Sequence, residues 1–192
     1  MNAAYRENNL NLDHIKLVIF DFDGTLAIHK NKDFLKHRNE SEEKRQKYYL
    51  NAYKNPDIFY EEIEPCDKSE VLYNFVNGLR NKNIKMYCLS GMKFSFNLKA
   101  KQSFINKHYG NDIEVVSVGS QQLKLDGIKI LAKANNCSLD KILFIEDLDD
   151  TVNYLKENGI CAVNVNDIKG GGIMIELVKK ENLRNYSDED YV

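Results

Sequence analysis

Two aspartates, Asp21 and Asp23, follow directly on a continuous apolar run from Leu17 to Phe20. Such a run is typical of a strand that is buried on both faces in a parallel sheet. Because side chains alternate along a strand with a period of two, both carboxylates leave its end in nearly the same direction. Like charges this close resist joint ionisation unless a cation lies between them or one carboxyl keeps its proton. The pair therefore suits metal binding or acid–base chemistry.

The next two residues, Gly24 and Thr25, suit a site at this strand end. Glycine permits a sharp departure of the backbone from the strand, and the threonine hydroxyl can bind an oxyanion or cap the turn. An ordinary Asp-Gly turn would explain the dipeptide equally well. The choice between these interpretations depends on the rest of the chain.

Polar residues also stand where three further strand-like runs end: Ser90 with Gly91, then Lys124 after a short polar loop, and Glu146 with Asp147. In open α/β sheets ligands bind outside the carboxyl ends of the strands, so these residues can converge with the two aspartates on one site. A dense group of carboxylates is the oxygen-rich setting that Mg²⁺ prefers. The lysine and the hydroxyl groups would then face phosphate oxygens.

The order of the elements indicates the fold that would bring these residues together. Strands are predicted at Lys16–Asp21, Lys85–Leu89, Ile113–Val118, Ile142–Glu146 and Cys161–Val165. Helical patterns lie between them: one after a capping pair formed by Asp67 and Glu70, one from about Phe96 to His108 before Gly110, one from Asp149 to Asn158 before Gly159, and a short one near Ile173 to Lys180. The alternation predicts a Rossmann-like α/β fold, with a five-stranded parallel sheet between two layers of helices.

One connection is much longer than this fold requires. About forty residues separate Thr25 from the helix near Asp67, whereas strand-to-helix loops usually take two to six. A helix is predicted inside this connection, from Ser41 to about Tyr53. We therefore expect one domain over residues 1–192, with a small helical cap inserted at residues 30–62 and a flexible charged tail at residues 181–192.

Composition excludes several classes of partner. The chain has 192 residues and a formal net charge of −2, which argues against a basic stripe for nucleic acid or a polybasic membrane surface. No apolar run approaches the length needed to span a bilayer, and the polar first residues do not resemble a signal peptide. A soluble cytoplasmic protein is expected, and its oligomeric state is not indicated.

The motifs resemble the four signature motifs of the haloacid dehalogenase superfamily, whose members are chiefly phosphatases: Asp21-Phe22-Asp23-Gly24-Thr25, Ser90, Lys124 and Glu146-Asp147. The resemblance implies hydrolysis of a phosphate monoester, with Asp21 as the nucleophile and Asp23 as the general acid and base. It implies that Thr25, Ser90 with Gly91, and Lys124 hold the phosphate. It also implies a Mg²⁺ site built from Asp21, the backbone carbonyl of Asp23, and Asp147, with Glu146 as a further candidate ligand.

Three questions stay open at this stage. Lys129 is a rival to Lys124, although it is expected to lie within a helix and not ahead of one. A phosphomutase or phosphotransferase would use the same residues and pass the phosphoryl group to a sugar. A phosphoacceptor receiver domain also has an acid cluster, a hydroxyl, a lysine and five parallel strands, but its phosphorylated aspartate would end the third strand, which here ends at Val118. The substrate is expected to be a small phosphorylated metabolite of unspecified identity.

Overall fold

A five-stranded parallel sheet forms the centre of the molecule, in the order β5-β4-β1-β6-β7. The computed structural model describes residues 12–30, 40–41, 43–44, 47, 62–66, 70–91, 95–119 and 123–169. The strands are β1 (Leu17–Phe20), β4 (Lys85–Gly91), β5 (Ile113–Val118), β6 (Ile142–Glu146) and β7 (Cys161–Asn164). The predicted fold class is confirmed, and each predicted strand is present with its ends shifted by at most two residues.

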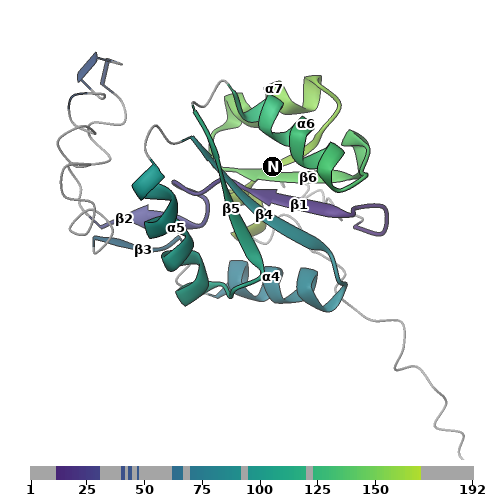
Figure 1. Cartoon of the computed structure of the whole chain (residues 1–192), viewed down its shortest axis with the longest axis horizontal. Coiled ribbons are helices and arrows are strands. Elements are labelled where there is room, and N and C mark those ends of the chain that lie inside the picture. The colour runs from purple at the N-terminus through teal and green to yellow at the C-terminus, as the bar shows by residue number, and fades with distance from the viewer. Residues whose placement is uncertain are drawn as a thin grey trace, which may run out of the picture.

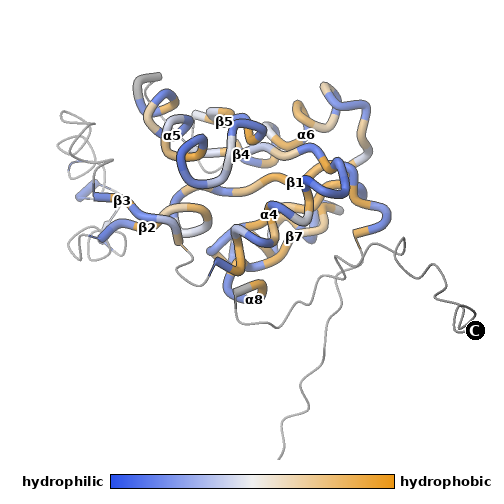
Figure 2. The backbone as a smooth tube through the Cα atoms, turned by 90° about the horizontal axis from the view of Figure 1, so that it is seen from below, coloured by the Kyte–Doolittle hydropathy of each residue, from blue (hydrophilic) through white to orange (hydrophobic). Residues whose placement is uncertain are grey.

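Strand β1 lies at the middle of this sheet and divides the core into two halves. All four of its residues are buried, as expected for a central strand with helices on both faces. Val18 and Phe20 join one cluster of apolar side chains, and Leu17 and Ile19 join a second cluster on the opposite face. Figure 2 shows this strand largely in the hydrophobic colours. The uninterrupted apolar run in the sequence thus reflects burial on both faces.

The helices form the two outer layers of the molecule (Figure 1). One layer consists of α4 (Val71–Asn81), α5 (Ser95–His108) and α8 (Val165–Lys169), and the other of α6 (Lys124–Ala134) and α7 (Asp149–Glu157). A 3₁₀ turn, Leu139–Lys141, leads into β6. Gly110 and Gly159 follow α5 and α7 with φ of 107° and 78°, as predicted for helix ends.

A short antiparallel ribbon outside the sheet was not predicted. It pairs β2 (Ala27–His29) with β3 (Ile63–Pro65), and Lys30 N donates to Glu62 O at 2.8 Å. The ribbon therefore joins the two ends of the long connection (Figure 1). Three residues per strand carry too little alternation to be recognised as strands in a sequence.

Several predictions fall outside the described residues or need correction. The predicted helices at 173–180 and, for the most part, 41–53 lie outside them, as do Asp67 and the tail at residues 181–192. Helix α4 begins at Val71, and its N-cap residue Glu70 has φ of 62° and makes no side-chain capping bond. Glu70 thus does not act as predicted. In the described ranges, no helix is both long and apolar enough to cross a bilayer.

The order of the sheet decides against the receiver domain. Numbered along the chain, the five strands lie in the order 3-2-1-4-5. The flavodoxin-like order, to which receiver domains belong, is 2-1-3-4-5. Here the first strand lies between the second and the fourth, whereas in the flavodoxin-like order it lies between the second and the third. A different choice of strand boundaries would not convert one order into the other.

Candidate active site

The loop after β1 holds the first two aspartates at the carboxyl edge of the sheet. Asp21 N donates to the Ile145 carbonyl at 2.9 Å, which continues the pairing of β1 with β6. Between the two aspartates, Phe22 is completely buried and packs edge-on against Phe104 of α5, with ring centroids 5.5 Å apart. Because Phe22 is anchored in the core, the backbone positions of Asp21 and Asp23 on either side of it are fixed.

Gly24 is required in this loop for two reasons. Its φ of 89° lies in the left-handed region that side chains disfavour. A Cβ atom at this position would also collide with the Asp147 carboxylate. The Gly24 backbone is further held by its N–H, which donates to the Ala27 carbonyl at 2.8 Å. The glycine in the first motif therefore makes room for the acid of the fourth motif.

Lys124 joins two of the candidate acids in a buried triad. Its ammonium donates to Glu146 Oε2 at 2.6 Å and lies 2.7 Å from Asp21 Oδ1. The side chains of Lys124, Asp21 and Glu146 are 2%, 8% and 0% exposed. Lys124 is the first residue of α6, whereas its rival Lys129 lies in the middle of that helix and is exposed.

Burial dominates the electrostatics of the triad. It raises the pKa of the Asp21 carboxyl, against the attraction of Lys124 and with added repulsion from Asp23. It also raises the pKa of Glu146 to about 8, with the Asp21 charge adding to the effect. Burial by itself would lower the pKa of Lys124, but the two carboxylates hold it above its ordinary value. The triad therefore binds protons tightly when no other cation is present.

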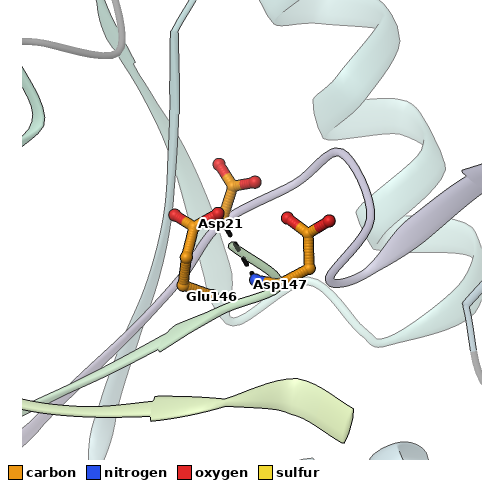
Figure 3. Close-up of side chains that lie close together, drawn as sticks. All are labelled: Asp21, Glu146 and Asp147. Carbon is orange, nitrogen blue, oxygen red and sulfur yellow. Dashed lines mark hydrogen bonds between the residues drawn. The ribbon is translucent and has the colours of Figure 1, made fainter. Parts of the chain in front are cut away.

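Asp147 extends the acidic group towards the loop after β1. Oxygens of Asp21, Glu146 and Asp147 all lie within 4.8 Å of one another, and Figure 3 shows the three carboxylates pointing to the same side. Asn164, at the end of β7, supports this arrangement because its amide donates to the Asp147 carbonyl at 3.1 Å and to Asp149 Oδ1 at 2.7 Å. Asn164 was missed because the predicted strand ran past it to Val165.

These residues fit a divalent cation. With Asp23 included, four carboxyl groups face two ammonium groups, those of Lys124 and Lys101. The pKa values of Asp21 and Glu146 are raised mainly by burial, and a neighbouring carboxylate adds to each shift. Hard oxygen ligands at this density suit Mg²⁺. The carboxylate of Asp23 is not part of this acid cluster, and the metal contact through its backbone carbonyl stays a prediction.

Lys101 of α5 holds the carboxylate of Asp23 and was not predicted. Its ammonium donates to Asp23 Oδ2 at 2.6 Å and to Ser90 Oγ at 2.8 Å, and it lies 4.3 Å from the centre of the Phe22 ring. Partial burial would raise the pKa of Asp23, but Lys101 brings it below its ordinary value. The sequence did carry a signal, because Lys101 occupies the same helical stripe as the apolar Phe104 and Ile105.

Of the predicted phosphate ligands other than Lys124, Ser90 contacts Lys101 directly. Ser90 is buried in the last part of β4, and Gly91 ends that strand. Thr25 is completely buried, and its hydroxyl has no hydrogen-bond partner in the described structure. A buried hydroxyl without a partner is costly, which favours a ligand at this position. The edge of the sheet thus offers cationic and hydroxyl groups beside the acids.

No protein-family model and no curated protein sequence matches the chain. Solved structures do resemble it. A Bacteroides fragilis protein assigned as a haloacid dehalogenase-like hydrolase is 14% identical, with a TM-score of 0.54 over 77% of this chain and 86% of that one. A haloacid dehalogenase-family enzyme from Bacteroides thetaiotaomicron, in complex with magnesium and inorganic phosphate, is 13% identical, with a TM-score of 0.54 over 78% and 93%.

A third similar structure is a protein from Lactobacillus delbrueckii subsp. bulgaricus assigned as a phosphoglycolate phosphatase. It is 12% identical, with a TM-score of 0.53 over 83% of this chain and 92% of that one. At these identities the likeness shows a shared fold. The chemistry of this chain depends on its own residues and not on the fold alone.

Proposed function

We propose that this chain, which has the haloacid dehalogenase-like fold, is a Mg²⁺-dependent phosphatase that hydrolyses a small phosphate monoester through an aspartyl phosphate on Asp21. One observation carries the proposal: two aspartates of the same loop are held by two different lysines. Asp21 contacts Lys124 inside the acid cluster, and Asp23 contacts Lys101 beside Ser90. Two neighbouring carboxylates in different surroundings can take different chemical roles.

In the first half of the reaction, Asp21 is the nucleophile. One of its carboxylate oxygens attacks phosphorus, and the bond from phosphorus to the ester oxygen breaks. Asp23, which must take up a proton before this step because Lys101 holds its pKa below the ordinary value, gives that proton to the departing oxygen, so that an alcohol leaves. Lys124 keeps the Asp21 carboxylate oriented through their 2.7 Å contact. The hydroxyl of Thr25, which belongs to the same loop, and that of Ser90, which contacts Lys101, would hold the non-bridging oxygens of the phosphoryl group.

In the second half, water releases the phosphoryl group. Asp23, now ionised, accepts a proton from a water molecule whose oxygen attacks phosphorus. The bond from phosphorus to Asp21 breaks, and inorganic phosphate leaves. The side chain of Asp23 is 42% exposed, which gives it the access to water that this step needs. Assistance of this kind contributes typically about 10²- to 10⁴-fold to the rate.

The metal would be held by Asp21 and Asp147, with Glu146 within reach of the same position. When bound, Mg²⁺ supplies positive charge that neutralises the phosphoryl oxygens and the excess of acids. Gly24 leaves the space that the Asp147 carboxylate occupies in this arrangement. The residues on the other side of the loop, Asp23 and Lys101, are then left for the leaving group and the water.

The test is a screen of phosphate monoesters, including a small aryl phosphate, with purified protein in Mg²⁺ and in excess chelator. We expect hydrolysis only with Mg²⁺, and its loss in Asp21→Asn because an amide is a poor nucleophile and a weaker ligand. Asp126→Asn, which changes an exposed acid of α6, is the matched control and is expected to keep full activity. Activity of Asp21→Asn near that of the control would overturn the proposal.

A phosphomutase would reveal itself in the same assay. Added sugar acceptors would then collect the phosphoryl group during turnover, whereas a phosphatase releases it as inorganic phosphate. The ratio of phosphorylated acceptor to inorganic phosphate separates the two activities. We expect inorganic phosphate to predominate.

A further inference from the structure

Helix α5 carries a polar stripe at the end that faces the candidate site. Asn97 and Lys101 stand four residues apart, so they lie on the same face one above the other. The stripe continues into the buried Phe104 and Ile105, which pack in the core. Both polar side chains are buried, Asn97 being 1% and Lys101 4% exposed. The proposed mechanism gives Asn97 no contact with substrate and gives Lys101 no contact with the phosphoryl group.

Lys101 is placed to bind a phosphoryl oxygen. An ammonium has three donors, and two of them bond Asp23 Oδ2 and Ser90 Oγ. Because Ser90 accepts from Lys101, its own hydroxyl proton is left for another acceptor. A phosphoryl oxygen that accepts from Ser90 would lie within reach of the third donor of Lys101. A charge-assisted bond of this kind is stronger than a neutral one.

Asn97 provides an independent sign of a ligand. Its amide nitrogen and its amide oxygen are both buried, and neither has a hydrogen-bond partner in the described structure. A buried polar group left unsatisfied destabilises the folded protein, so such a group needs an explanation. An amide offers both donors and an acceptor, which together suit a hydroxyl group.

The direction of α5 separates the tasks of these two residues. The helix follows β4 and begins beyond the carboxyl end of that strand. Asn97 therefore lies four residues, about 6 Å along the helix axis, farther beyond the strand end than Lys101. A phosphoryl group between Asp21, Ser90 and Lys101 would extend its leaving group past Asn97.

We propose that Lys101 and Asn97 form a second substrate-binding face of the site. Lys101 binds a phosphoryl oxygen together with Ser90, and Asn97 binds a hydroxyl group of the leaving alcohol. The substrate class is then a phosphate ester of a hydroxylated alcohol, such as a polyol or a sugar. This inference rests on the proposed phosphatase activity and adds two residues and a substrate class to it.

The role of Lys101 is tested through the affinity for inorganic phosphate, measured by calorimetry with Mg²⁺ and as product inhibition of aryl phosphate hydrolysis. Lys101→Met is expected to weaken phosphate binding about tenfold or more, the equivalent of one charge-assisted hydrogen bond, and Lys101→Arg to restore part of it. Lys99→Met, at an exposed position of the same helix, is the control. Unchanged phosphate affinity in Lys101→Met, with only turnover reduced, would leave Lys101 as a support for Asp23 and overturn its binding role.

The role of Asn97 is tested with two esters of equal carbon number, glycerol 3-phosphate and propyl phosphate. The wild-type protein is expected to favour the hydroxylated ester in kcat/KM. Asn97→Leu is expected to reduce that preference about tenfold, because a buried hydrogen bond that fixes a substrate is lost, while phosphate affinity is kept. Asn97→Asp, which keeps an acceptor, is expected to retain part of the preference. If the wild type does not prefer the hydroxylated ester, or if Asn97→Leu keeps the same preference as the wild type, the proposed role of Asn97 is overturned.

The proposed phosphatase activity and the roles of Lys101 and Asn97 would be contradicted by different results. Absence of Mg²⁺-dependent hydrolysis for every ester would remove the proposed function and the inference with it. Hydrolysis that depends on Asp21, combined with unchanged phosphate affinity in Lys101→Met, would remove the inference alone. Thermal unfolding of each variant verifies its folding, and Lys101→Gln replaces Lys101→Met if the latter does not fold.

Discussion

The two lysines of the site hold their aspartates in very different surroundings. Lys124, Asp21 and Glu146 form a triad that is almost completely closed to solvent. Lys101 is equally buried, but its partner Asp23 is 42% exposed. The pKa of Asp21 is raised by burial, whereas that of Asp23 is brought below its ordinary value, mainly by Lys101 against the effect of burial. One loop therefore presents a restrained carboxylate and an accessible one.

This difference corresponds to what the two steps of phosphoryl transfer require. A nucleophile benefits from a fixed direction of attack, because positioning supplies a large part of the rate. An acid and base must exchange protons with water between the two steps. The surroundings of Asp21 satisfy the first requirement. The exposure of the Asp23 side chain gives it the contact with water that the second requires, while Lys101 favours its ionised form, which is the form that acts as a base. Variants on the two sides should accordingly fail in different ways.

We call the triad of Lys124, Asp21 and Glu146 the closed side of the site, and the pair of Lys101 and Asp23 the open side. The largest effect is expected on the closed side, from Lys124→Met. It leaves two buried carboxylates without their cation, so both turnover and stability should fall. Breaking a buried ion pair typically costs about 3–5 kcal/mol, measurable as the free energy of unfolding in urea with chelator present. Lys129→Met, at an exposed position of the same helix, serves as the control. A loss of stability no greater than that of the control would show that the triad is not structural.

On the open side, Asp23→Asn should damage turnover and spare stability. The loss of proton transfer should lower kcat for an alkyl phosphate about 10²- to 10⁴-fold, and less for an aryl phosphate whose leaving group needs no proton. Because the Asp23 side chain is partly exposed, its ion pair should contribute at most about 1 kcal/mol to stability. A fall in kcat below tenfold would contradict the acid–base role.

The closed side should also make stability depend on pH. In the metal-free protein Glu146 has a pKa of about 8, against 4.5 for the ordinary carboxyl. The folded chain therefore holds a proton that the unfolded chain has lost, so the free energy of unfolding should fall as pH rises from 4.5 to about 8 and then level off. Urea unfolding with chelator at several pH values should show a shallower fall for Glu146→Gln. Equal slopes in the two proteins would refute this explanation.

The smallest effect is expected at the support of the fourth motif. Asn164→Ala removes the two hydrogen bonds to Asp147 and Asp149. Stability should drop by about 1–2 kcal/mol, and the Mg²⁺ concentration for half-maximal activity should rise. Asn153→Ala, an exposed change on α7, is the control. Unchanged Mg²⁺ dependence would mean that Asn164 does not orient the acids.

The sequence predicted those parts of the molecule in which a single local pattern determines the secondary structure or the position of a site residue. The run from Leu17 to Phe20 is apolar because both faces of β1 are buried, and the acids after β1 and β6 follow from where those strands end. Lys101 escaped prediction because its role depends on the distance between α5 and the loop after β1. The helical stripe that Lys101 shares with Phe104 and Ile105 indicates that it faces inward, but it does not indicate which loop the lysine meets. That residues 30–62 form a cap stays a prediction, although β2 and β3 pair with each other at the two ends of this insertion.

The central claim is that Asp21 carries the phosphoryl group, and it can be tested by trapping that group. In Asp23→Asn, an aryl phosphate can transfer its phosphoryl group without an acid, but the release by water lacks its base, so the adduct should accumulate. Mass spectrometry of peptides after a single turnover with Mg²⁺ should then find one phosphoryl group on the peptide that contains Asp21, and none when Asp21→Asn is added. Release of phosphate with no adduct at any time, or an adduct on another residue, would contradict the claim.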